Sequence, residues 1–305
     1  ASGLSKGQRL LIVPDGALEY LPFGALPWPG RRDPLLIRHD VVMLPSASTL
    51  AALRREEARR KTPSHQLAVF ADPVFDLGDA RVGSKLGSRA NAPWETTLAR
   101  VLRDMSGLRP DAPLPRLVFT RQEAQGIAAL WPEDQRVLAM DFAAKKAAVL
   151  EASLADYRTI HFATHAFVDT RQPRLSGLVL SLVDEDGTVQ DGIVRLHEIY
   201  RLKLAAELVV LSACHSGLGK QIQGEGLIGL TRGFLYAGAA RVVASLWKVD
   251  DEATAKLMRE FHRRMSSNGL RPSAALRQAQ IALRQTKLWR DPFYWAAFVL
   301  QGEPN

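Results

Sequence analysis

The sequence contains a single cysteine, Cys214, in 305 residues. One thiol cannot build an internal disulfide framework or a zinc site made of several thiolates. No hydrophobic run approaches the roughly 18 residues that suggest a membrane span, and no secretory signal is evident at the start. We therefore expect a protein of the reducing cytoplasm that carries no membrane segment and needs no cofactor or metal.

Aromatic residues are also scarce, at 7% of the chain, although the formal net charge is +8. The only dense basic run covers residues 54–61, on a helix predicted over 49–60. A solvated helix face is the ordinary explanation of such a run. Because no aromatic side chains are interleaved with it, the stacking platform of a nucleic-acid site is missing. We expect no direct nucleic-acid binding by this chain.

The first third of the chain is a mixture of short strands and turns. Two apolar runs around Pro14-Asp15-Gly16 predict a hairpin, and further strands are expected over 41–45 and 67–71. Residues 76–93 lack periodicity and predict a loop. The proline-containing stretch 109–115 is the best candidate for a domain boundary. We therefore predict two units, 1–115 and 116–305.

Beyond residue 115, strands and helices alternate. Runs such as Val209–Ala213 and Val242–Leu246 are continuously apolar rather than alternating, as expected for parallel strands covered on both faces. Two late helices are predicted over 251–266 and 272–286, the first with acidic residues and the second with a proline in its first turn. The pattern predicts an α/β sandwich with a site at the carboxyl ends of its strands.

Two of these predicted strands run directly into a reactive side chain. The first covers 157–165 and ends at His165, and the second covers 208–214 and ends at Cys214. A thiol near its free pKa of about 8.5 is mostly protonated and needs a base or a positive neighbour. An imidazole at the end of a parallel strand can serve as that base, which is the arrangement of a cysteine protease. The alternatives are a small buried thiol and a capped histidine at a strand end.

Two other histidines compete for the role of the base. His161 lies four positions before His165 in the same predicted strand, so both side chains are expected on one face. Its place inside an apolar run favours a packed, hydrogen-bonded histidine. His215 adjoins the thiol, but the side chain of a neighbour along the chain usually points away. His165 is therefore the preferred base.

The intermediate of acyl transfer also requires hydrogen-bond donors for its oxyanion. The backbone N–H groups of Ala166 and Cys214 are the natural pair. Gly217 and Gly219 would allow the following loop to turn tightly around the thiol.

A candidate substrate-binding segment follows the next helix. The end of the predicted strand 241–247 contains Ser245, Leu246 and Trp247, and its edge could pair with an extended peptide. Trp247 either walls a pocket or packs into the core. Asp250 and Asp251 either cap the next helix or place one carboxylate at the floor of a pocket for a basic side chain.

Taken together, the motifs resemble those of the CHAT-domain family, which comprises caspase-like and separase-like cysteine peptidases often fused to TPR repeats. The resemblance rests on the joint order of segments spread over nearly the whole chain. These segments are LLIVPDGALEYLPFGAL (10–26), LPSAS (44–48), HFATH (161–165), LVVLSAC (208–214), GEGLIGLTRGFLYAGA (224–239), VVASLWKVDDEAT (242–254) and YWAAFVLQG (294–302).

The resemblance implies a caspase-like three-layer sandwich with a mainly parallel central sheet over 116–305, preceded by an accessory or degenerate caspase-like region over 1–115. It implies that Cys214 is the nucleophile and His165 the general acid and base. It also implies cleavage of a protein partner after a basic residue, with Asp251 receiving that residue's side chain. An attached sensor such as a TPR region, or an activating partner, would gate the activity.

The chain departs from the pattern of the family in two places, after the cysteine and after the histidine. His215 and Ser216 stand where members usually have Glu and Thr, and Ala166 stands where the histidine is usually followed by Gly. Alanine keeps the N–H group but resists a positive φ. The alternative function is therefore a catalytically inactive caspase-like scaffold that binds a peptide by strand addition.

Overall fold

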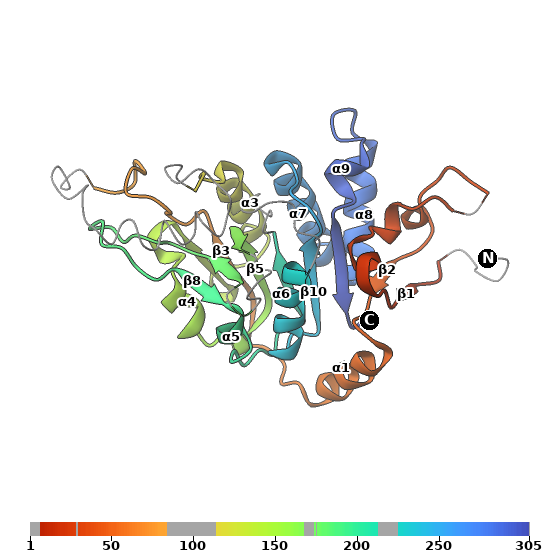
Figure 1. Cartoon of the computed structure of the whole chain (residues 1–305), viewed down its shortest axis with the longest axis horizontal. Helices are drawn as coiled ribbons and strands as arrows, with labels where there is room; N and C mark the ends of the chain where they lie inside the picture. Colours follow the sequence, from red (N-terminus) through yellow and green to blue (C-terminus); the bar gives the residue numbers. More distant parts are fainter. Residues whose placement is uncertain are drawn as a thin grey trace.

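The computed structural model describes residues 7–28, 30–83, 114–167, 174, 176–212 and 225–304. Its centre is an eight-stranded sheet with the strand order β1-β2-β11-β10-β9-β5-β3-β4 (Figure 1). All neighbouring strands in this sheet are parallel except the antiparallel pair β10–β11, which confirms the mainly parallel prediction. The strands are β1 (Leu10–Ile12), β2 (Val41–Met43), β3 (His65–Ala71), β4 (Arg136–Met140), β5 (Tyr157–Ala163), β9 (Leu208–Leu211), β10 (Arg241–Ser245) and β11 (Phe298–Gly302).

Helices cover the two faces of this sheet, which makes three layers. One core packs the sheet against α3 (Val118–Ala128), α7 (Asp251–Ser266) and α8 (Pro272–Gln285). The other core packs it against α1 (Ala47–Arg59), α4 (Lys146–Leu150), α5 (Leu196–Ile199) and α6 (Glu225–Tyr236). Successive residues of one strand enter opposite cores, as Val69 and Phe70 of β3 do. The continuously apolar strands are therefore buried on both faces, as the sequence predicted.

Several helix boundaries follow from local chemistry. The Ser46 hydroxyl accepts the N–H of Thr49 at 3.0 Å and so caps α1. The Asp250 carboxylate accepts the N–H of Ala253 at 2.9 Å at the start of α7. Pro272 occupies the first turn of α8, where its missing N–H costs nothing. The predicted bounds of both late helices are confirmed to within one residue.

The predicted amino-terminal hairpin is wrong. β1 pairs in parallel with β2, and the chain after Asp15 forms a 3₁₀ helix over Gly16–Tyr20 instead of a returning strand. The Asp15 side chain accepts the N–H of Gly16 at 2.8 Å and starts this helix. The apolar run after the turn therefore never reaches a sheet, although its composition resembles that of a strand.

The long predicted strand 157–165 divides at Thr164. β5 ends at Ala163, and β6 (His165–Phe167) joins a separate three-stranded antiparallel sheet with β7 (Gly177–Val179) and β8 (Ile193–Arg195). The Thr164 hydroxyl donates a hydrogen bond to the carbonyl of Val179 and fixes the break. The prediction that His161 and His165 extend from one strand is therefore wrong.

Strands from both sides of residue 115 belong to the same large sheet. β3 lies between β5 and β4, and β2 pairs with β11, so the red amino-terminal strands lie beside the blue carboxyl-terminal strand (Figure 1). The boundary region 109–113 and most of the predicted loop, 84–93, lie outside the described residues. The division into an accessory region over 1–115 and a peptidase domain over 116–305 stays a prediction.

Candidate active site

His165 lies at the first position of β6, two residues beyond the carboxyl end of β5. Its side chain is buried, with 1% of the residue exposed, and its ring centre is 4.9 Å from that of Phe75. Nε2 is 2.8 Å from the carbonyl oxygen of Pro115. Because a carbonyl oxygen can only accept a hydrogen bond, Nε2 carries the proton of the neutral ring, and Nδ1 keeps a lone pair.

The Nδ1 atom of His165 is buried and has no hydrogen-bond partner among the residues that the structure describes. Burial, helped by the positive charge of Lys248, lowers the pKa of His165 to about 4, although the hydrogen bond to Pro115 opposes this change. The ring is therefore neutral at pH 7 and can accept a proton at Nδ1. This is the state that a general base requires.

The predicted nucleophile, Cys214, lies outside the described residues, together with His215, Ser216, Gly217 and Gly219. The structure describes the strand that leads toward it. β9 runs parallel to β5 with Leu211 beside Phe162, and the next residue, Ser212, is buried. The carboxyl ends of β5 and β9 therefore meet at one edge of the sheet, two residues before His165 and three before Cys214. The pairing of His165 with Cys214 stays a prediction.

Ala166, the second predicted oxyanion donor, is buried and lies opposite Leu178 in the β6–β7 pair. It follows His165 directly, so its backbone is held by the same strand pairing. Its role as an oxyanion donor stays a prediction.

The predicted substrate-binding strand lies inside the sheet. Ser245 is buried opposite Phe298 of β11, and its hydroxyl donates to the carbonyl of Trp247. The N–H of Leu246 donates to the carbonyl of Ala297 at 2.9 Å. Toward β9, the pairing of β10 reaches only Ala244. Any peptide paired with this segment would therefore have to approach from the β9 side.

Trp247 and Asp250 have structural contacts of their own. The indole N–H of Trp247 donates to the carbonyl of Phe293 at 3.1 Å, and the side chain packs against the core to which α7 and α8 contribute. Asp250 caps α7, which is the simpler of its two predicted roles. A binding role for either residue stays a prediction.

Asp251 differs from Asp250 in its surroundings. It is half-buried at the first position of α7, and burial, followed by the neighbouring acids Glu123 and Asp250, raises its pKa to about 6. Lys248 opposes this rise. Because Lys248 acts on both Asp251 and His165, these two groups share one electrostatic environment at the end of β10.

Sequence reasoning missed a chain of buried polar groups behind the site. His161 lies 2.8 Å from Glu123 Oε1 through Nε2 and 3.1 Å from His262 Nε2 through Nδ1. Burial raises the pKa of Glu123 to about 8 and lowers that of His161 to about 3. Both groups are therefore neutral near pH 7, and the carboxylic acid donates to the imidazole. The prediction of a packed, hydrogen-bonded His161 is confirmed.

One signal could have revealed Glu123. It lies four positions before Ile127 and three after Thr120, so it shares the buried face of α3. A glutamate on the apolar face of a helix needs a polar partner in the core. The carbonyl of Pro115 has no comparable signal, because its position depends on the path of the chain.

Within the described ranges, no group of three or more His, Cys, Asp or Glu side chains is gathered in a way that could hold a metal ion. No helix of this part of the chain is both long and apolar enough to cross a membrane.

The three layers and the mainly parallel sheet are those of the caspase-like peptidase fold. The yeast separase chain in the crystal structure of the Saccharomyces cerevisiae separase–securin complex superposes with a TM-score of 0.53 at 16% identity, over 97% of this chain and 15% of that one. The likeness shows the fold alone.

The chain belongs to the CHAT domain family, whose model matches residues 2–303. Among curated proteins it is similar to Tetratricopeptide repeat protein 28 of Mus musculus, with 25% identity over 333 residues, and of Homo sapiens, with 24% identity over 336 residues. Each match covers 98% of this chain and only 12% of the relative. The resemblance inferred from the motifs is confirmed.

Proposed function

We propose that this chain is a cysteine endopeptidase in which Cys214 and His165 form a catalytic dyad. The observation that carries the proposal is the state of His165. Its Nε2–H is bound to the Pro115 carbonyl, while its buried Nδ1 has no partner in the described part of the chain. The caspase-like fold and the CHAT family support the same class of chemistry.

In the proposed first step, the sulfur of Cys214 attacks the carbonyl carbon of the scissile peptide bond, and the thiol proton passes to Nδ1 of His165. The backbone N–H groups of Cys214 and Ala166 hold the oxyanion. His165 then gives the proton to the leaving amine, and a thioester remains. Water, deprotonated by the same Nδ1, cleaves the thioester and restores the thiol. Proton transfer of this kind contributes about 10²- to 10⁴-fold to the rate.

Asp251 is the proposed floor of a pocket for a basic side chain. Burial and the negative charge of Asp250 raise the pKa of its carboxylate, so a cation in the pocket would stabilise the ionised form. Ser245, Leu246 and Trp247 would present the backbone with which the substrate pairs. The preferred substrate would therefore be an extended protein segment with arginine or lysine before the cleaved bond.

An arginine-containing peptidyl acyloxymethyl ketone tests the dyad, because it alkylates a thiolate within a peptide-binding site. We expect mass spectrometry to locate the label on Cys214, and Cys214→Ala and His165→Gln to remove it. His215→Ala, which removes the adjacent imidazole, is the matched control and should keep the labelling. Equal labelling of the wild type and His165→Gln would refute the dyad.

The pocket is tested by the choice between two electrophiles. Asp251→Asn should lower labelling by the arginine reagent relative to a leucine reagent, and Glu252→Gln, at the next and exposed position, should leave the ratio unchanged. An unchanged ratio in Asp251→Asn would discard the pocket. Peptide binding without any labelling would favour the alternative of an inactive scaffold that binds by strand addition.

The setting of this activity is part of the proposal. The chain covers only 12% of its TPR-containing relatives, so a protein substrate, a cytoplasmic location and gating by an attached TPR region or a partner remain proposals. Co-expression of this chain with candidate TPR segments, followed by the same labelling assay, tests the gating. Labelling that is unaffected by every such segment would contradict it.

A further inference from the structure

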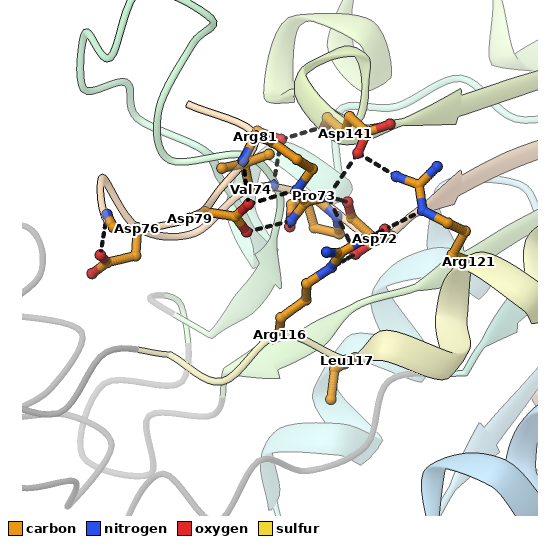
Figure 2. Close-up of polar contacts among 12 residues, drawn as sticks. Asp72, Pro73, Val74, Asp76, Asp79, Arg81, Arg116, Leu117, Arg121 and Asp141 are labelled. Carbon is orange, nitrogen blue, oxygen red and sulfur yellow. Dashed lines mark hydrogen bonds and ion pairs between the residues drawn. The ribbon is translucent and has the colours of Figure 1, made fainter. Parts of the chain in front are cut away.

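A cluster of arginines and aspartates lies at the carboxyl ends of β3 and β4 (Figure 2). Asp72 directly follows β3, and Asp141 directly follows β4. Both have positive φ angles, 46° and 54°, in the left-handed region that residues other than glycine seldom adopt. Such a conformation persists only where the surroundings enforce it.

Asp72 is the centre of this cluster and is 1% exposed. Arg116 binds both of its carboxylate oxygens, with Nε 2.8 Å from Oδ1 and Nη2 2.7 Å from Oδ2. Arg121 Nε lies 2.7 Å from Oδ2, and Arg81 Nη1 lies 3.3 Å from Oδ1. A buried carboxylate needs such pairing, and a two-bond contact with a guanidinium also fixes its orientation.

The same cluster is anchored to the neighbouring strand. Arg121 also binds Asp141, and Arg81 Nη1 lies 2.7 Å from Asp141 Oδ1. Two arginines thus join the acids that follow β3 and β4, so Asp72 has little freedom to move. Asp72 is therefore a rigid anchor for the side chain of Arg116 and for the backbone attached to it.

Arg116 directly follows Pro115, whose carbonyl accepts the hydrogen bond from His165 Nε2 at 2.8 Å. The two hydrogen bonds from Arg116 to Asp72 consequently hold the backbone of Arg116. The peptide bond between Pro115 and Arg116 contains the carbonyl that contacts the imidazole. Proline limits its own φ and has no N–H, which leaves this segment few alternative conformations.

We propose that Asp72 and Arg116 are positioning residues that hold the Pro115 carbonyl against His165 and so select the Nε2–H tautomer. The inference rests on the proposed function, in which Nδ1 of His165 must be free of a proton. If the carbonyl moved, both tautomers of the neutral ring would be populated, because no other hydrogen-bond partner of Nε2 is found among the described residues. A ring with its proton on Nδ1 cannot accept another proton there.

The tautomer can be measured directly from the ¹⁵N chemical shifts of the imidazole in two-bond ¹H–¹⁵N spectra at pH 7, with His165 assigned by its loss in His165→Gln. The wild type should show a single Nε2–H tautomer. Arg116→Met should show a mixture. This variant is expected to fold because Arg116 is 37% exposed at its side chain and Asp72 keeps Arg81 and Arg121.

Asp79→Asn is the matched control, because Asp79 belongs to the same cluster and its side chain binds Arg81, at 2.6 Å, and no other side chain among the described residues. It should leave the His165 tautomer unchanged. Arg116→Lys keeps the charge without the two-bond geometry and should give an intermediate mixture. Asp72→Asn should resemble Arg116→Met where it folds. A pure Nε2–H tautomer in folded Arg116→Met, or an equal mixture in Asp79→Asn, would overturn the inference.

Labelling of Cys214, the only thiol, separates this inference from the proposed function. If the tautomer shifts in Arg116→Met and labelling slows about 10-fold or more, as for loss of a general base, both stand. If the tautomer shifts but labelling is the same in every variant, including His165→Gln, the positioning stands and the dyad fails. If the tautomer is unchanged while His165→Gln abolishes labelling, the positioning fails and the dyad stands.

Discussion

Replacing Glu123 by glutamine tests whether this buried acid is neutral. Glu123 is 1% exposed, and its Oε1 lies 2.8 Å from His161 Nε2. Glutamine has nearly the same shape, its amide can donate to the same nitrogen, and it does not titrate. The variant therefore removes the titration of one carboxyl while it keeps the hydrogen bond.

The sign of the effect follows from the raised pKa. Burial raises the pKa of Glu123 from 4.5 to about 8, so between these values the unfolded chain releases a proton that the folded chain keeps. The wild type therefore loses stability as the pH rises through this window. At 1.36 kcal/mol for each pKa unit, the loss between pH 5 and pH 7 is roughly 2 kcal/mol. The stability of Glu123→Gln should not show this loss, because glutamine does not titrate.

Urea unfolding at pH 5, 6, 7 and 8 measures the free energy of unfolding of both proteins. The stability of Glu123→Gln relative to the wild type should rise by roughly 2 kcal/mol from pH 5 to pH 7. Glu133→Gln is the control, since the Glu133 side chain is 94% exposed and should give a nearly constant difference. If the difference in unfolding free energy between Glu123→Gln and the wild type does not change with pH, Glu123 is ionised in the folded protein and the reasoning is refuted.

Three further perturbations have definite expected outcomes. Burial lowers the pKa of His165 from 6.5 to about 4, so the wild type should lose roughly 2 to 3 kcal/mol of stability as the pH falls from 6.5 toward 4, and urea unfolding of His165→Gln should show a smaller loss. Gly302→Ala would place a methyl group 2.5 Å from the Ala240 carbonyl oxygen at a φ of 115°. The melting temperature of this variant should fall well below that of Gly269→Ala, in which the φ is also positive but the added methyl group has no atom within 4 Å. Equal melting temperatures of the two variants would contradict the clash. Asp250→Ala removes the cap of α7 and should lower the free energy of unfolding by about 1 kcal/mol. The ratio of labelling by the arginine reagent to labelling by the leucine reagent should not change. A changed ratio would assign Asp250 to the pocket.

The parts of the fold that could be predicted depend on local patterns. Continuous runs of valine and leucine predicted β9 and β10 because both faces of these strands are covered. Asp250 and Pro272 marked the starts of α7 and α8 because a cap and a first-turn proline act within one turn of helix.

The missed parts depend on contacts between distant residues. The break at Thr164 is fixed by a bond to Val179, fifteen positions away. The sequence pattern of residues 157–165 does not indicate the contact with Val179, so these residues resembled one uninterrupted strand. The false hairpin has a similar cause, because β1 pairs with β2 rather than with the apolar run that follows its turn.

In the candidate site, too, the features set by local sequence could be predicted and those set by distant contacts could not. Family motifs pointed to His165 and Cys214, and the apolar run before His165 indicated that this residue lies close to the carboxyl end of β5. Pro115 is fifty positions from His165, and His262 is 101 positions from His161. Pairings over such separations are set by the order of strands in the sheet, which one sequence alone does not reveal.

The order of the large sheet has a consequence for how the protein is made. β2 is flanked by β1 and by β11, with Val42 beside Leu300, so β2 meets its inner neighbour only after all the residues between Met43 and Phe298 have been synthesised. Contacts over such a span form slowly, and unpaired strands left exposed meanwhile invite aggregation. Nascent chains should thus remain dependent on chaperones until β11 has left the ribosome.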